Sequence, residues 1–90
     1  MPVLHINTFT QGTPKEAALK PLEEAAEVYG AWQRLEKTRT PWPSVKAYTE
    51  LGEEIADCVT ACANLAARYG IDLDAALAQV EEKNRTRGRY

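Results

Sequence analysis

Four acidic side chains, arranged as two pairs, are the residues whose types and spacing could do chemistry. Glu24 and Glu27 form the first pair, and Glu54 and Asp57 form the second. Residues three positions apart share a helix face, so each pair would present two aligned carboxylates. Two facing pairs would repel each other at neutral pH unless a cation lay between them, and oxygen ligands suit Mg²⁺, or else Mn²⁺. We therefore expect all four residues to be metal ligands and to form the catalytic site.

Such a site suits the hydrolysis of a polyphosphate. Divalent ions would neutralise the phosphate chain and lower the pKa of a bound water, so that the reaction needs no protein nucleophile. The sequence offers no obvious one, because its single histidine, His5, is far in sequence from its two cysteines, Cys58 and Cys62, which we expect to be reduced packing residues. The glutamates that could accept the proton of the attacking water are Glu23, Glu50 and Glu53.

The basic C-terminal end, residues 83–90, could bind the phosphate groups. Lys83 and Arg87 could stabilise charge on a leaving pyrophosphate, and Asn84 could hydrogen-bond the ligand. The aromatic residues that could stack against a base are Tyr29, Trp32 and Trp42.

Each of these features also has a purely structural interpretation. A single carboxylate pair is commonly part of a solvated helix face, and basic residues at a helix C-terminus complement the helix dipole. A tryptophan on a helical stripe, such as Trp32, more often packs in a core or a dimer interface than against a base. The combination of two acidic pairs, each next to an apolar stripe, favours the functional interpretation.

The residues before and after Thr13 differ in pattern. Residues 1–12 show no helical period, and we expect an extended or loop segment there. A capping box follows, in which Thr13 is the N-cap and Glu16 lies three residues later, and it begins a helical domain over residues 13–90. Pro21 predicts a kink or short break in the first helix, because proline lacks the backbone donor.

Two further helices are expected after the first, which should end near Lys37. Ser44 can cap the second helix and Gly70 can end it, while Asp72 can cap the third. The apolar positions of the second helix alternate in steps of three and four, which is typical of a packed seam. These positions are Tyr48, Leu51, Ile55, Cys58, Cys62, Leu65 and Tyr69. The buried faces of the other helices are predicted at Leu22, Ala25, Tyr29, Trp32 and either Leu35 or Glu36, and at Leu73, Leu77 and Val80.

Length and composition limit the class of protein. One domain of 90 residues supplies only about 3–5 kcal/mol from its core, so we expect a homodimer or homotetramer. A net charge of −2 is unsuited to nucleic acid, and no apolar run approaches the roughly 20 residues of a membrane span. Without a leader pattern at Met1, the chain is expected to be cytoplasmic, with neither nucleic acid nor membrane as a partner.

The two acidic pairs resemble a known family signature. The runs Glu24-Ala25-Ala26-Glu27 and Glu54-Ile55-Ala56-Asp57, followed by Lys83-Asn84, are similar to the ExxE…ExxD pattern of the MazG-like nucleotide pyrophosphohydrolases, in the all-α NTP pyrophosphatase superfamily. The resemblance covers residues 13–90. It implies an all-α helical bundle completed by oligomerisation, with Mg²⁺ bound by the four acids and Lys83 and Asn84 contacting substrate. The implied reaction cleaves a nucleoside triphosphate to the monophosphate and pyrophosphate, in control of the nucleotide pool.

Two alternatives fit the same sequence. The superfamily includes phosphoribosyl-ATP pyrophosphohydrolase, whose acidic elements this chain echoes, although that branch tends to have a histidine where this chain has Ala61. A non-catalytic module for oligomerisation or partner binding would keep the bundle, but it would gain no stability from Mg²⁺. A carboxylate-bridged di-iron bundle is disfavoured, because the sequence has no Glu-x-x-His element.

Overall fold

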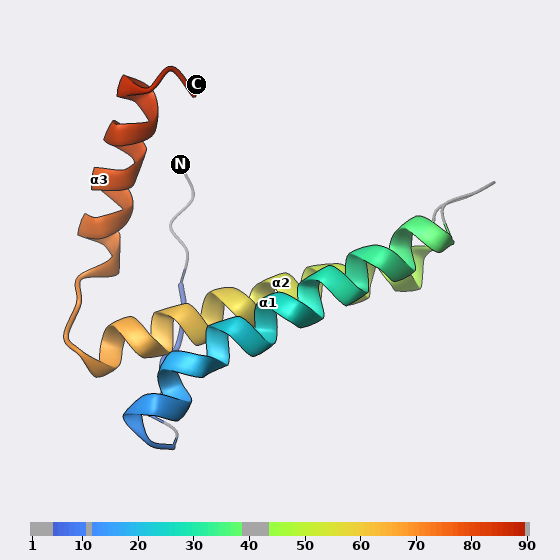
Figure 1. Cartoon of the computed structure of the whole chain (residues 1–90), viewed down its shortest axis with the longest axis horizontal. Helices are drawn as coiled ribbons and strands as arrows, with labels where there is room; N and C mark the ends of the chain where they lie inside the picture. The colour runs from blue at the N-terminus through green and yellow to red at the C-terminus, as the bar shows by residue number, and fades with distance from the viewer. Residues whose placement is uncertain (1–4, 11, 39–43, 90) are drawn as a thin grey trace.

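Three helices make up the ordered framework of the chain in a computed structural model, which describes residues 5–10, 12–38 and 44–89. They are α1 (Pro14–Lys37), α2 (Val45–Arg68) and α3 (Leu73–Thr86). No strand occurs in the described ranges, so this part of the chain is all-helical, as predicted. α1 and α2 run antiparallel as a long hairpin, and α3 leaves the end of α2 and points away from the hairpin (Figure 1). Trp42 lies outside the described residues.

Each helix begins directly after its predicted N-cap. Thr13 Oγ1 accepts the N–H of Glu16 at 3.1 Å, and Thr13 N–H donates to Glu16 Oε1 at 2.9 Å, which completes the capping box. Because the Thr13 N–H bonds the ionised carboxylate, it lowers the pKa of Glu16 from its ordinary value of 4.5. Ser44 and Asp72 cap α2 and α3 through the N–H groups of Ala47 and Ala75.

The break predicted at Pro21 does not occur, since α1 is continuous across it. Proline removes one hydrogen-bond donor but leaves the bonds on both sides intact, which a helix of 24 residues tolerates. The Pro21 carbonyl faces α2 and accepts a hydrogen bond from Cys58 Sγ at 4.0 Å. Burial and the neighbouring Cys62 raise the pKa of the Cys58 thiol, and both thiols are free.

The core between α1 and α2 is made almost entirely of small side chains. Alanine permits a close approach of two helices, but it buries little apolar area per residue. No large side chain is fully buried in the part of the chain that the structure describes. The buried residues are Glu24, Ala31, Leu35, Ala47, Ala61, Ala63 and Ala66.

The apolar seam predicted for α2 meets α1 only in part: Cys58 lies against the Pro21 carbonyl of α1, whereas the large seam residues are mostly exposed. Tyr48, Ile55 and Tyr69 are 55%, 46% and 62% exposed, so most of the large seam residues remain accessible. The physical reason is size: the neighbouring alanine stripe allows the closer helix contact and turns the large side chains outward. The neighbouring stripe that carries Glu54 and Ala61 faces α1 instead.

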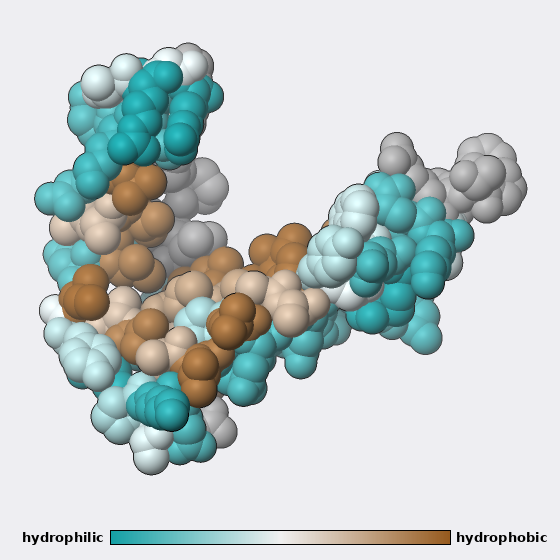
Figure 2. Space-filling model, in the orientation of Figure 1, coloured by the Kyte–Doolittle hydropathy of each residue, from teal (hydrophilic) through white to brown (hydrophobic). Residues whose placement is uncertain are grey.

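The other two predicted apolar faces are also largely exposed. Leu22, Tyr29 and Trp32 of α1 are accessible, and α3 has no buried residue along its described length. Hydrophobic side chains gather along the hairpin and on the side of α3 that faces the open angle between them (Figure 2). Within the described ranges, no helix is long and apolar enough to cross a membrane.

Candidate metal centre

Three of the four predicted carboxylates come together between α1 and α2. One oxygen from each of Glu24, Glu27 and Glu54 lies within 4.8 Å of the others. Glu24 and Glu27 stand one turn apart on α1, and Glu54 reaches them from α2, as the i, i+3 spacing and the facing helices require. Three carboxylate oxygens at this separation can share one hard divalent cation.

Two oxygens of this acidic cluster are buried without a hydrogen-bond donor. Glu24 is only 8% exposed, and Glu54 is half-buried. The Oε2 atoms of both residues accept no hydrogen bond from the described residues. A buried carboxylate oxygen without a partner is strongly unfavourable, and a second carboxylate beside it makes the cost larger. The donor set therefore fits a cation, which would bind both oxygens and reduce the repulsion.

Lys20 holds the other oxygen of Glu24. Its Nζ lies 3.3 Å from Glu24 Oε1 and 3.5 Å from Glu23 Oε2. The hydrogen bond to Glu24, together with the charges of Glu24 and Glu23, raises the pKa of Lys20 above its ordinary 10.5. Glu24 is thus anchored through Oε1, while Oε2 is buried without a donor among the described residues. Sequence reasoning missed Lys20, although its place four residues before Glu24 was a usable signal.

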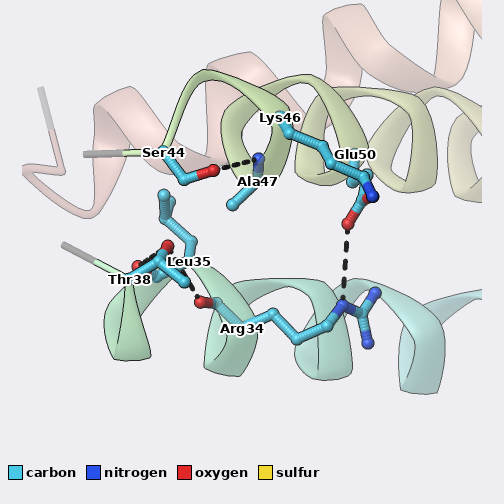
Figure 3. Close-up of polar contacts among 7 residues, drawn as sticks. All are labelled: Arg34, Leu35, Thr38, Ser44, Lys46, Ala47 and Glu50. Atoms are coloured by element: carbon cyan, nitrogen blue, oxygen red, sulfur yellow. Dashed lines mark hydrogen bonds and ion pairs between the residues drawn. The ribbon is translucent and has the colours of Figure 1, made fainter.

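The fourth predicted ligand and the candidate bases surround the cluster. Asp57 is exposed and is not part of the group of three, although it follows Glu54 by one helical turn. Glu23 and Glu53 are exposed. Glu50 lies 3.7 Å from Arg34 Nε and 3.9 Å from Lys46 Nζ, and Figure 3 shows the first of these pairs linking the two helices near their loop. The carboxylate of Glu50 is therefore engaged in two ion pairs.

The predicted substrate-binding residues lie on a different part of the chain. Lys83 and Arg87 are exposed, and the Oδ1 of half-buried Asn84 accepts a hydrogen bond from Arg89 Nη1 at 3.0 Å. In the described ranges, no hydrogen bond or ion pair joins α3 to the acidic cluster. Glu54 precedes the end of α2 by roughly 21 Å of helix, and α3 then points away (Figure 1). Within one chain, the predicted substrate-binding residues therefore do not come close to the acidic cluster.

The aromatic candidates Tyr29 and Trp32 stack on each other. Their ring centroids are 5.7 Å apart with an interplanar angle of 24°, and both side chains are exposed on α1. Mutual stacking occupies one face of each ring and leaves the other accessible. This pair suits a packed interface at least as well as it suits a ligand.

No protein-family model, curated protein or solved structure matches this chain. The resemblance to a known family therefore remains one of short motifs. The chemical assignment depends on the acidic cluster, its burial and its unpartnered oxygens.

Proposed function

We propose that this chain is a Mg²⁺-dependent nucleoside triphosphate pyrophosphohydrolase that releases the monophosphate and pyrophosphate. The observation that supports it most is the pair of buried, unpartnered oxygens on Glu24 and Glu54 beside Glu27. Two buried carboxylate oxygens beside the exposed Glu27 carboxylate repel one another at neutral pH, and a bound cation would reduce that repulsion. Oxygen-only ligands favour Mg²⁺ over softer metals. The order of the ExxE and ExxD motifs favours this reaction among those that use Mg²⁺.

Each residue has a defined role in this proposal. Glu24, Glu27 and Glu54 hold the metal, and Asp57 supplies a further carboxylate from the next turn of α2. Bound Mg²⁺ would neutralise phosphate charge and lower the pKa of a water. Exposed Glu53 accepts a proton from the attacking water, since no cation is paired with it in the described part of the chain.

The proposal includes a homodimer or homotetramer. The chain exposes 7193 Å², whereas a compact protein of 10.0 kDa exposes about 5,200 Å². Its radius of gyration is 15.7 Å, against about 12 Å for a compact chain of this length. The excess is roughly 2,000 Å² per chain, or about 4,000 Å² for two chains, which falls within the range of about 2,000–5,000 Å² that the two partners of an obligate dimer bury together. A second copy would cover the exposed apolar faces and could bring its Lys83, Asn84 and Arg87 toward the acids.

Pyrophosphate release from a panel of nucleoside triphosphates tests this function. We expect turnover that requires Mg²⁺ and falls by at least about 100-fold in Glu54→Gln, because the substitution removes a charged ligand. Mg²⁺ should also raise the melting temperature of the wild type and not that of Glu54→Gln. Glu81→Gln on α3 is the matched control, since its carboxylate only pairs with Arg85 at the surface.

Two results would contradict the proposal. If no triphosphate in the panel is cleaved but phosphoribosyl-ATP is, the chain belongs with that alternative activity. If neither is cleaved and Mg²⁺ does not raise the melting temperature, the chain is a non-catalytic helical module.

A further inference from the structure

A pocket of about 240 Å³ lies beside the acidic cluster, where Phe9, Thr10 and Gly12 meet the hairpin. Its walls come from the N-terminal segment, from the first turns of α1 and from the last turns of α2. Phe9, Lys20, Asn64 and Arg68 are among the lining residues. None of these residues was predicted to form a site.

Two hydrogen bonds between distant parts of the sequence hold the N-terminal wall in place. The Phe9 N–H donates to Asn64 Oδ1 at 2.9 Å, and Arg68 Nη1 donates to the Gly12 carbonyl at 3.1 Å. Gly12 has a φ of +71°, and a Cβ there would lie 3.0 Å from Glu16 Oε1, so the turn before α1 requires glycine. These contacts hold Phe9 and Gly12 against α2, and the pocket lies between them and the hairpin.

The pocket and the acidic cluster lie along one continuous face of the hairpin. On α2, Glu54, Ala61 and Arg68 are spaced by seven residues, which brings them to nearly the same side at intervals of about 10 Å. On α1, Lys20 lines the pocket and also contacts Glu24 of the cluster. A ligand lying along this face would place one end in the pocket and the other at the carboxylates.

The lining of the pocket suits a nucleoside better than a phosphate group. Phe9 is 54% exposed and offers an aromatic face on which a base can stack. Asn64 uses its oxygen for the Phe9 N–H, which leaves its amide N–H groups for a ligand, and Arg68 keeps donors beyond the one bonded to Gly12. The Glu16 and Glu23 carboxylates add acceptors and offset the charges of Lys20 and Arg68, so the lining has no net positive charge to attract phosphate.

We infer that this pocket binds the base and sugar of the triphosphate whose phosphate groups lie at the acidic cluster. The inference rests on the proposed function, because that function places the phosphates. Phe9 and Asn64 then help determine which nucleotide is accepted, and Lys20 lies where base and sugar meet the phosphate chain.

Filling the pocket from α1 tests the inference in the full-length chain. Ala17 lines the pocket, whereas Ala18, the next residue, is exposed and lies outside it, so Ala17→Leu and Ala18→Leu are matched. We expect Ala17→Leu to raise KM for the best triphosphate by about tenfold with little change in kcat, because only substrate binding is obstructed. Inhibition by inorganic tripolyphosphate, which has no nucleoside, should stay as in the wild type. Equal KM values for the two variants would overturn the inference while the proposed function stands.

A binding experiment keeps the inference testable without turnover. The nucleoside alone, added to the wild-type protein in Mg²⁺-free buffer, should shift the NMR signals of the Asn64 side-chain amide and the Phe9 N–H. Residues of α3, such as Ala76, should not shift. Absence of shifts at Asn64 and Phe9 with every common nucleoside would overturn the inference. Shifts there in a chain that cleaves no triphosphate would support the pocket and count against the proposed function alone.

Discussion

Glu24 has two carboxylate oxygens in different surroundings. Oε1 pairs with Lys20, and Oε2 is buried without a donor among the described residues; one oxygen of Glu24 lies within 4.8 Å of Glu27 and Glu54 oxygens. The ammonium of Lys20 and a divalent cation would therefore neutralise the same negative charge from two sides. Because the Lys20 ammonium and the bound cation would neutralise the same carboxylates, the presence of one reduces the stabilisation that the other provides.

Lys20→Met tests this competition. We expect the variant to melt at a lower temperature than the wild type without Mg²⁺, and to show a larger rise in melting temperature when Mg²⁺ is added. Thermal unfolding followed by circular dichroism, with and without Mg²⁺, measures both. Lys15→Met is the control, since Lys15 has no ion pair among the described residues. An equal Mg²⁺-dependent rise in the two variants would show that Lys20 does not share charge with the metal.

The carboxylates could be predicted from sequence, but their surroundings could not. The i, i+3 spacing was enough to align Glu24 with Glu27, and the alanines beside the acids indicated that they face another helix. The pocket depends on a hydrogen bond between Phe9 and Asn64, which are 55 residues apart, and no local pattern signals such a contact.

The stability of the first turn of α1 should depend on pH. The hydrogen bond from Thr13 holds the pKa of Glu16 below 4.5, so the ionised carboxylate favours the folded helix end. This contribution is fully present above pH 4.5 and is lost as the pH falls through the lower, folded-state pKa. NMR titration of the Glu16 carboxyl carbon should give a midpoint below 4.5, with the Thr13 N–H signal following the same curve. A midpoint at or above 4.5 would mean that the capping box is not formed in solution.

The three helices could be predicted because the residues that start a helix are recognised locally in the sequence. Thr13, Ser44 and Asp72 were expected as N-caps, and each helix begins at the following residue. The packing face of α2 was predicted only in part, because a pattern of apolar spacing does not say which of two neighbouring stripes has a partner within the chain. The alanines of α2 are buried, whereas on the predicted stripe Cys58 contacts α1 and Tyr48 and Ile55 stay exposed.

At the scale of the whole molecule, the exposed apolar stripes are the main evidence for association. Ile55→Lys places a charge in the exposed stripe of α2 and should shift the protein from oligomer to monomer at micromolar concentration. Ala67→Lys adds the same charge on another side of α2, at an exposed residue, and should leave the mass unchanged. Light scattering coupled to gel filtration measures both. A monomeric wild type, or an equal loss of mass in both variants, would contradict the proposed assembly.

The acidic cluster and the pocket are built from different parts of the chain. The spacing of the carboxylates is set by the packing of α1 on α2, whereas one wall of the pocket comes from Phe9, Thr10 and Gly12, which lie outside the helices. Substitutions at these positions would reshape the wall without disturbing the helix contact. Under the proposed function, selection on these positions would change the range of accepted nucleotides while the acidic cluster is inherited unchanged.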